Sequence, residues 1–490
     1  MGEILYSRKR VSMKKSLFRN LIWKFSERIL SQAVTLIVSI ILARLLEPQD
    51  YGIIAMVTIF ITLAEVFVNE GFGSALIQKK DADELDFSTA LIFNMALSGV
   101  LYLLLYIASP YIADFYGPEY GILVPVLRVL GLRLMISAVN SIQLAQISRN
   151  MEFHKSFLST ISGTVCSAVV GITMAYSGWG VWALVAQYLT NAMINTVALR
   201  IVIGTFPKLR FSGHRLKAML QYGIRILGTS LLNTGFVELR ALIIGKMYSS
   251  ASLAYYDKAK QFPNLIAANT NTTIATVLFP RLSLDQDNPQ KVKQITRKAV
   301  RFSSYLMFPL MLGFAAVAEP FVRVVLTEKW ISCVPMLQLF CVVYLFQPIH
   351  LANLQAIKAM GRSDLYLKLE SFKKVIELAV LLLTISTGVT GIVLAMAVTT
   401  TVFTFVNAYP NAKLINYPFR EQMKDILPSL VISSVMAVVV VLVGFLSFGP
   451  FVLLVLQVAT GVVIYLLLSV MTGNKEFVFI VDKLSGMLRK

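Results

Sequence analysis

Residues 428–472 read PSLVISSVMAVVVVLVGFLSFGPFVLLVLQVATGVVIYLLLSVMT and contain no Asp, Glu, Lys or Arg. The Gly449-Pro450 pair divides this stretch into two apolar runs, for which we predict helices at 428–447 and 450–472. An α-helix needs about 20 apolar residues to cross a ~30 Å hydrocarbon core. Each run therefore predicts one membrane-spanning helix.

Similar apolar runs recur along the whole 490-residue chain. The composition agrees, because 57% of the residues are hydrophobic and only 14% are charged, whereas soluble domains carry about 25% charged residues. This excludes a water-soluble enzyme, and a count of 3 cysteines excludes a disulfide scaffold. We predict an all-α integral membrane protein with about 14 transmembrane helices, at 25–46, 51–69, 88–109, 121–147, 156–177, 179–204, 221–246, 253–281, 298–319, 333–358, 366–388, 390–413, 428–447 and 450–472.

The basic residues predict the orientation of these helices. The 45 Lys and Arg outnumber the 26 Asp and Glu, which gives a net charge of +19. They cluster in alternate loops, as they do on the cytoplasmic side of membrane proteins, whereas the loops at 111–120, 387–391 and 447–450 contain neither Lys nor Arg. We therefore expect both termini in the cytoplasm and no nucleic-acid partner.

The chain contains a weak internal repeat. Val124-Pro125-Val-Leu opens the predicted fourth span, and Val334-Pro335-Met-Leu opens the tenth. A second, shorter sequence match relates Ala43-Arg44 to Gly245-Lys246. Because the units lie six spans apart, both halves have the same orientation, and the substrate site of such a parallel repeat lies between the halves.

The repeat and the loops together predict two bundles of six helices, with the last two spans outside the repeat. The predicted parts are a basic cytoplasmic N-terminus at 1–24, a first bundle at 25–204, a cytoplasmic loop at 205–220, a second bundle at 221–413 with an inter-helix linker at 283–297, two additional helices at 428–472 and a cytoplasmic tail at 473–490. The tail has the pattern of a short amphipathic helix on the inner membrane surface.

Several short segments together resemble the Wzx-type polysaccharide flippases. They are ARLLEP at 43–48, GFGSALIQKK at 71–80, LIIGK at 242–246, YYDKAKQFP at 255–263, VLFP at 277–280, EKW at 328–330 and AMGRSD at 359–364. The resemblance extends over nearly the whole chain. It points to the colanic-acid-exporter and teichuronic-acid-exporter branch of the superfamily that also contains the lipid II flippase and multidrug efflux pumps.

This resemblance implies a fold and a function. The fold is two six-helix bundles in a V-shaped, pseudo-twofold arrangement around a central cavity, plus two C-terminal helices. The function is transfer of an undecaprenyl-pyrophosphate-linked oligosaccharide repeat unit across the bacterial cytoplasmic membrane by alternating access, for surface polysaccharide biosynthesis. The implied partners are this lipid-linked substrate, membrane lipids and the polysaccharide polymerase and export machinery.

Such a substrate needs a polar, cationic path through the membrane. A hydroxyl group costs roughly 2–7 kcal/mol to move unpaired into hydrocarbon, and a pyrophosphate adds negative charge. Arginine suits pyrophosphate because its guanidinium donates two parallel charge-assisted hydrogen bonds. Charged residues within spans indicate function by default, so the candidate substrate-binding residues are Arg240, Arg28, Arg44, Lys246 and Arg225.

Each of these residues has a structural alternative. Arg240 either lines the cavity or pairs with Glu238 or Glu65. Arg28 lies near an inner helix end, where a long side chain can reach the interface. Arg44 and Lys246 either receive the headgroup at its exit or anchor helix ends.

Three acidic residues in the spans are candidates for ion coupling. Glu65, Glu70 and Glu238 either carry a coupling H⁺ or Na⁺, as intramembrane carboxylates often do, or form ion pairs with nearby arginines. We expect no cofactor and no metal site.

An enzyme is disfavoured by the motifs. His154, His214 and His350 are scattered, and no Ser/His/Asp set, phosphate-cradling glycine loop or metal cluster occurs in the sequence. We therefore expect no catalytic residue. The alternative function is a cation-coupled multidrug efflux transporter of the same superfamily, in which acidic and aromatic cavity residues would be favoured over arginines.

Overall fold

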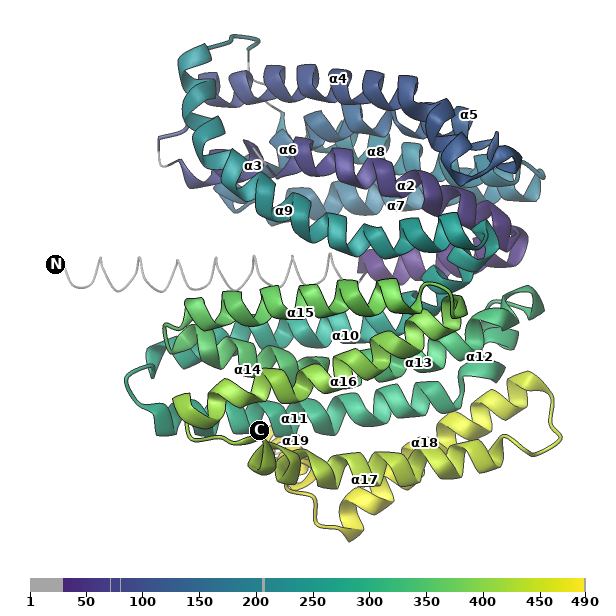
Figure 1. Ribbon diagram of the computed structural model, residues 1–490, viewed down its shortest axis with the longest axis vertical. Helices are drawn as coiled ribbons and strands as arrows, with labels where there is room; N and C mark the ends of the chain where they lie inside the picture. The colour runs from purple at the N-terminus through teal and green to yellow at the C-terminus, as the bar shows by residue number, and fades with distance from the viewer. Residues whose placement is uncertain (1–29, 71, 80, 205–207, 489–490) are drawn as a thin grey trace. The chain divides into compact units, whose positions relative to one another are not determined.

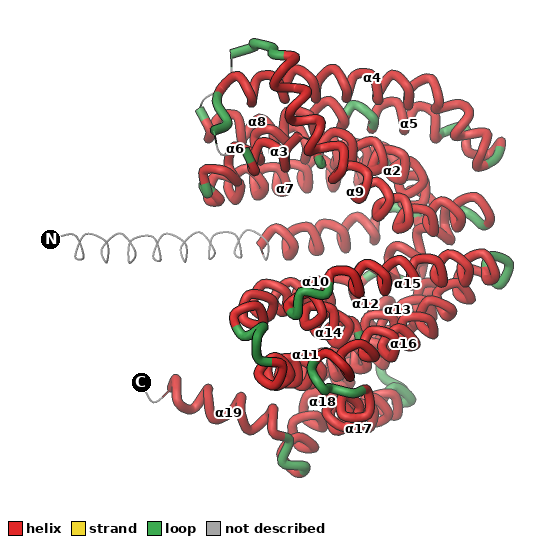
Figure 2. The backbone as a smooth tube through the Cα atoms, turned by 60° about the vertical axis from the view of Figure 1, so that its left-hand side comes forward, coloured by secondary structure: helices red, strands yellow, loops and turns green. Residues whose placement is uncertain are grey.

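The computed structural model describes residues 30–488 except 71, 80 and 205–207. Within these residues every regular element is a helix (Figures 1 and 2). Ten helices are long and apolar enough to cross a membrane, which confirms the predicted all-α membrane class. The predicted number of fourteen spans is not confirmed. The spans expected at 25–46, 179–204, 253–281 and 366–388 coincide with helices that lie outside those ten.

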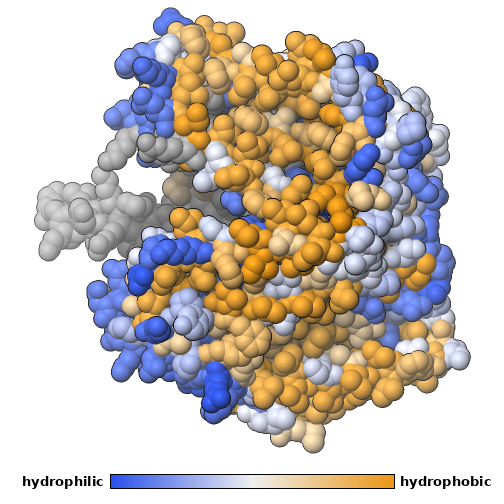
Figure 3. All heavy atoms as spheres, in the orientation of Figure 1, coloured by the Kyte–Doolittle hydropathy of each residue, from blue (hydrophilic) through white to orange (hydrophobic). Residues whose placement is uncertain are grey.

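Contacts divide the chain into two compact units, Met1–Ala254 and Tyr255–Lys490. On the visible face of each unit, hydrophobic side chains cover the middle of the helices and hydrophilic side chains gather at their ends (Figure 3). This distribution is typical of helices that cross a bilayer, because only the ends meet water and headgroups.

The first unit packs several long helices around α2. The helix α2 contacts α6, α8 and α9, while α7 packs along α8 and α4 contacts α5, α6 and α9. The elements of this unit are Leu30–Leu45, α2 (Pro48–Asn69), α3 (Phe72–Gln78), α4 (Glu84–Tyr116), the 3-10 helix η1 (Pro118–Tyr120), α5 (Leu123–Leu130), α6 (Arg133–Asn150), α7 (Phe153–Tyr176), α8 (Val181–Ile203) and α9 (Gly213–Met247).

The second unit is built around α11, which contacts α13, α14 and α17. In the same unit, α16 contacts α13, α14 and α15, and α18 contacts α17 and α12. The elements are α10 (Ser250–Leu284, which begins in the first unit), α11 (Pro289–Ala316), α12 (Ala318–Val325), the 3-10 helix η2 (Glu328–Cys333), α13 (Val334–Leu345), α14 (Gln347–Ala359), α15 (Ser363–Thr384), α16 (Gly388–Leu414), α17 (Phe419–Val443), α18 (Pro450–Met471) and α19 (Lys475–Leu488).

The helix α9 belongs to the first compact unit, where it packs on α2, α3 and α4. We expected the helix at 221–246 to open the second bundle instead. Because compact units reflect contacts rather than repeat boundaries, the bundle limits 25–204 and 221–413 stay a prediction.

The polar linker expected at 283–297 is mostly helical. The helix α10 continues to Leu284 and α11 begins at Pro289, so only residues 285–288 separate them. Asn288 caps α11 by accepting a hydrogen bond from the Lys291 N–H at 3.1 Å, and proline is favoured at the first helical position. The sequence pattern was misleading because these polar residues form the first turns of a helix.

The predicted fourth and tenth spans are each broken into two helices, although the break lies sooner after Pro125 than after Pro335. The first break separates α5 from α6 at Gly131-Leu132, and the second separates α13 from α14 at Phe346. Each broken span is preceded by a 3-10 helix: two residues separate η1 from α5, and η2 ends directly before α13. The two units therefore share a local design as well as a sequence echo.

The other ends of these broken spans also match. Met151, after α6, and Gly361, after α14, both adopt left-handed backbone conformations, with φ of 56° and 73°. In both turns the next N–H donates to a carbonyl five residues earlier, at 3.1 and 3.2 Å. Because Met151 follows Pro125 at the same spacing as Gly361 follows Pro335, the repeat continues without a gap through both spans. These details support the predicted internal repeat.

Candidate functional site

The helix α9 carries four polar residues on one side, called here its polar face, although Phe236 and Ile243 lie on the same side. Of the ten candidate spans, its segment Ile226–Met247 is the least buried and the least apolar. Arg225, Thr229, Asn233 and Arg240 follow one another at helical spacing and so share one side of α9. The Thr229 and Asn233 side chains are exposed. A polar face that is exposed at membrane depth normally borders a water-filled cavity or another protein surface.

Arg240 is half-buried on this face. Its Nε is shielded from solvent and has no hydrogen-bond partner among the residues that the structure describes. Glu238 lies two positions earlier, which places it on a different side of the helix, since residues at i and i+2 do not face each other. The guanidinium therefore retains donor capacity for an anionic group.

Glu65 does not pair with Arg240. It pairs with Arg133, which joins α2 to α6 with Nε 3.0 Å from one carboxylate oxygen and Nη2 donating to the other at 3.3 Å. The Glu65 side chain is 12% exposed, so this pair is largely shielded from solvent. Of the two ion pairs that we considered for Arg240, the one with Glu65 is not formed, because Glu65 pairs with Arg133 on α6.

The other two acidic candidates lie at different places in the first unit. Glu70 is half-buried directly after α2, and its N–H donates to the Val66 carbonyl at 3.1 Å. Glu238 is half-buried on α9. Among the described residues, Glu65, Glu70 and Glu238 do not form a cluster that could hold a metal ion, and their coupling role stays a prediction.

The two cations expected at helix ends share a local setting. Lys246 lies in the last turn of α9, donates to the Phe115 carbonyl and lies 5.0 Å from the centre of the Phe115 ring. Arg44 is exposed at the end of the helix Leu30–Leu45. Each follows a small, buried residue, Ala43 or Gly245. The contact of Lys246 connects α9 to the end of α4, as expected for an anchor, and its role at the exit stays a prediction.

Two further candidates cannot be placed fully. Arg28 lies outside the described residues, and Arg225 is on α9 although its side chain lies outside them too.

Within the described part of the chain, no group of three or more His, Cys, Asp or Glu is arranged to hold a metal ion.

Sequence reasoning missed a second polar helix. On α10, Asn269, Thr272 and Thr276 are exposed and bond to carbonyls of their own helix at 2.8–3.0 Å. The richness of residues 253–281 in Thr and Asn was the available signal. Pro263 and Pro280 do not break this helix, which is continuous from Ser250 to Leu284.

Sequence reasoning also omitted the charges of α15. Lys373 pairs with Glu370, and Lys374 pairs with Glu377 at 3.2 Å. Lys373 is 8% exposed and lies 5.9 Å from the centre of the Phe403 ring. These residues lie within the span predicted at 366–388, so the rule applied to Arg240 would have selected them.

Comparison with known proteins gives the chain a family context. The family model described as "Polysaccharide biosynthesis protein" matches residues 41–335. The chain is 24% identical over 448 residues to the lipopolysaccharide biosynthesis protein WzxC of Escherichia coli (strain K12), covering 88% of this chain and 89% of that protein. It is 25% identical over 308 residues to the teichuronic acid biosynthesis protein TuaB of Bacillus subtilis (strain 168), covering 62% of each.

Solved structures share the fold. The lipid II flippase MurJ, in an inward closed conformation, matches with a TM-score of 0.75 and 14% identity, covering 92% of this chain and 98% of that one. An inward-facing multidrug resistance transporter of the MATE family matches with a TM-score of 0.61 and 16% identity, covering 78% and 95%. At these identities the likeness concerns the fold alone.

Proposed function

Because this chain belongs to the polysaccharide biosynthesis protein family, whose model matches residues 41–335, we propose that it is a flippase for a lipid-linked oligosaccharide. The substrate is an oligosaccharide repeat unit on undecaprenyl pyrophosphate, and the membrane is the bacterial cytoplasmic membrane. The relative WzxC, similar over 88% of this chain, is named for lipopolysaccharide biosynthesis. The chain moves its substrate without changing it chemically, so no catalytic residue is assigned.

The exposed polar face of α9 is the observation that carries this proposal. The headgroup of the substrate has many hydroxyls and a pyrophosphate, and each unpaired hydroxyl costs roughly 2–7 kcal/mol in hydrocarbon. The hydroxyl of Thr229 and the amide of Asn233 are exposed and can replace water around such a headgroup. The isoprenoid tail is apolar and stays in the bilayer.

Arg240 is proposed to hold the pyrophosphate at membrane depth. Its shielded Nε lacks a partner among the described residues, and an arginine fork matches phosphate oxygens. Arg225 and Arg28 are proposed to act at the entry side, and Arg44 and Lys246 at the exit side. At 1.5 Å rise per residue, Arg225 and Lys246 lie about 32 Å apart along α9, which is the thickness that the headgroup must cross.

Alternating access is the proposed mode of movement. The two bundles rock against each other in a V-shaped arrangement, so that the polar face opens to one side of the membrane at a time. Both termini lie in the cytoplasm in this proposal, which the basic loops support. The translocated lipid-linked oligosaccharide is passed to the polysaccharide polymerase and export machinery. Uptake of H⁺ or Na⁺ by Glu238 or Glu70 couples transport to an ion gradient.

Leaflet exchange in reconstituted vesicles tests the function. The purified chain is placed in liposomes with a fluorescent undecaprenyl-pyrophosphate oligosaccharide, and an impermeant quencher is added outside. We expect the quenched fraction to exceed the outer-leaflet pool only when protein is present. Failure to exchange the lipid under imposed H⁺ and Na⁺ gradients, together with transport of cationic drugs, would establish the efflux function instead.

A further inference from the structure

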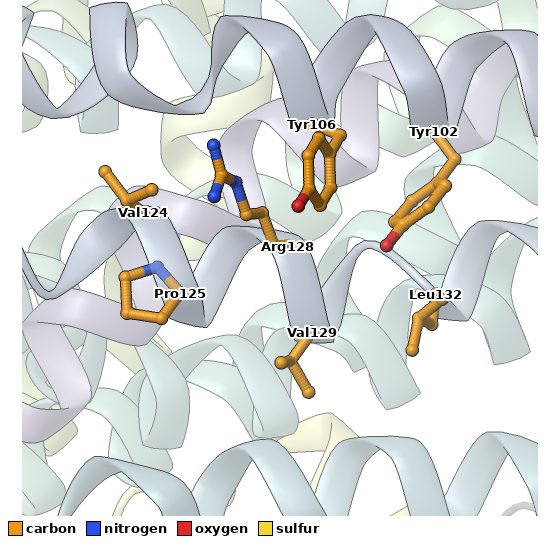
Figure 4. A pocket seen from close by; sticks show the side chains of 7 residues that line it. All are labelled: Tyr102, Tyr106, Val124, Pro125, Arg128, Val129 and Leu132. Carbon is orange, nitrogen blue, oxygen red and sulfur yellow. The ribbon is translucent and has the colours of Figure 1, made fainter.

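A pocket of about 350 Å³ lies between α4 and α5 of the first unit. It is lined by Tyr102, Tyr106, Val124, Pro125, Arg128, Val129 and Leu132. The tyrosine hydroxyls point from α4 toward α5, and the Arg128 guanidinium lies beside the Tyr106 ring (Figure 4). None of the lining residues is acidic, so the pocket carries one uncompensated positive charge.

The guanidinium of Arg128 is held in place but not neutralised. Its Nε donates to the Ser109 hydroxyl at 2.9 Å, and its central carbon lies 4.1 Å from the centre of the Tyr106 ring. Among the described residues, no hydrogen-bond or ion-pair partner is found for its two terminal nitrogens. These nitrogens can therefore donate to an anionic ligand in the pocket.

The internal repeat places a neutral side chain at the equivalent position of the second unit. Arg128 lies three residues after Pro125, and Gln338 lies three residues after Pro335. The Gln338 amide donates to the Ala315 carbonyl at 3.2 Å, which joins α13 to α11 as Arg128 joins α5 to α4. A neutral side chain thus makes the equivalent helix contact in the second unit. The cation of the first unit needs another explanation.

The surroundings of the pocket are those of a lipid-facing surface. On α4, Val100, Leu103, Leu104 and Ile107 are each more than half exposed, and α4 is a candidate membrane span. Arg128 lies five residues after the start of α5, about 8 Å along the helix at 1.5 Å per residue. This is close to the boundary between hydrocarbon and headgroups, to which a long basic side chain can extend.

We propose that this pocket binds the phosphate of an anionic phospholipid. The terminal nitrogens of Arg128 donate to the phosphate oxygens, the hydroxyls of Tyr102 and Tyr106 bond to the headgroup, and the acyl chains lie along the apolar surface of α4. This site is distinct from the polar face of α9. In the proposed topology it faces the outer leaflet.

Lipid-dependent stability tests the site. The full chain is purified in detergent, and its melting temperature is measured against rising amounts of phosphatidylglycerol or phosphatidylcholine with identical acyl chains. For wild type we expect greater stabilisation by phosphatidylglycerol. For Arg128→Gln, which copies Gln338, we expect an apparent affinity for phosphatidylglycerol about 10-fold lower, corresponding to one charge-assisted contact.

Two further variants separate the site from a general charge effect. Arg323→Gln removes a half-buried arginine of α12 that is paired with Glu319 and Glu328, and it should keep the full preference. Tyr102→Phe removes one hydroxyl without removing the ring, and it should weaken phosphatidylglycerol binding even if Arg128→Gln does not fold. An unchanged preference in Arg128→Gln and in Tyr102→Phe, or an equal loss in Arg323→Gln, would overturn the proposal.

Discussion

Three arginines of the first unit lie within candidate membrane-spanning segments and differ in what they contact. Arg133 is paired with Glu65, Arg128 rests on Tyr106 and Ser109, and Arg240 has a shielded nitrogen with no described partner. A charged group held away from water is costly unless it is paired. The charge of Arg133 is thus compensated within the fold, whereas Arg128 and Arg240 have donors left for a ligand.

These distinctions could not be predicted from the sequence. The presence of charges within spans pointed to Arg240 and Glu65 together, because both lie in apolar segments. Which acid meets which arginine depends on which helices adjoin, and that is set by packing between α2 and α6. The sequence did identify α9 and Arg240, since an arginine deep in a span is conspicuous on its own.

The Glu65–Arg133 pair allows a structural role to be separated from ion coupling. Glu65→Gln leaves Arg133 without its partner in a partly shielded site, so we expect a loss of about 2 kcal/mol in unfolding free energy. Glu65→Gln combined with Arg133→Gln should recover part of that loss. Denaturant unfolding in detergent measures both variants. Normal stability of Glu65→Gln, with transport that no longer responds to an ion gradient, would instead establish Glu65 as the coupling residue.

At the scale of elements, tight helix contacts depend on particular glycines. Gly52 near the start of α2 is buried, and a Cβ there would lie 1.9 Å from the Ser250 carbonyl oxygen at the start of α10. Two non-bonded heavy atoms cannot lie this close, so a side chain at position 52 would force one of the two backbone segments to move. The sequence alone could not show which segment passes so close to Gly52.

Gly52→Ala should therefore separate these two segments. We expect a loss of at least about 3 kcal/mol in stability, because the obstructing atoms belong to the backbone and cannot rotate away. Gly99→Ala on α4 is the matched control, since nothing lies within 4 Å of its added Cβ. The yield of monodisperse protein and its melting temperature compare the two. Equal stability of both variants would show that this contact is not present in the protein.

The matching turns after α6 and α14 give a second prediction for the elements. A left-handed conformation costs a residue with a side chain roughly 1–2 kcal/mol, whereas glycine adopts it freely. Gly361→Ala should thus destabilise the protein, and Met151→Gly should stabilise it by about 0.5–1 kcal/mol. Thermal unfolding of the two single variants should show a lower melting temperature for Gly361→Ala and a higher one for Met151→Gly. Changes of the same sign would contradict the equivalence of the two turns.

At the scale of the whole molecule, the sequence predicted the class, nearly all the helices and the repeat. Apolar runs predict membrane helices well because every backbone polar group in a bilayer must be bonded within the chain. The short helices α3 and α12 were missed, since their 7 and 8 residues are too few to form an apolar run of span length. The linker prediction at 283–297 was wrong because polarity alone does not distinguish a loop from a helix end.

The proposed topology is testable with single cysteines. In a chain whose Cys166, Cys333 and Cys341 are replaced by alanine, a cysteine at exposed Asp287 should lie inside and one at exposed Glu119 outside. An impermeant maleimide added to intact cells should label Glu119→Cys only, and permeabilised cells should label both. Labelling of Asp287→Cys in intact cells would reverse the topology.

The polar face of α9 is central to the proposed transport, and the charge of Arg240 tests it most directly. The initial rate of leaflet exchange of an undecaprenyl-pyrophosphate oligosaccharide is measured for wild type, Arg240→Lys and Arg240→Gln in matched vesicles. We expect Arg240→Gln to slow exchange about 10-fold or more, equivalent to one lost charge-assisted contact, with Arg240→Lys between the two. Folded Arg240→Gln that exchanges the lipid at the wild-type rate would contradict the assignment.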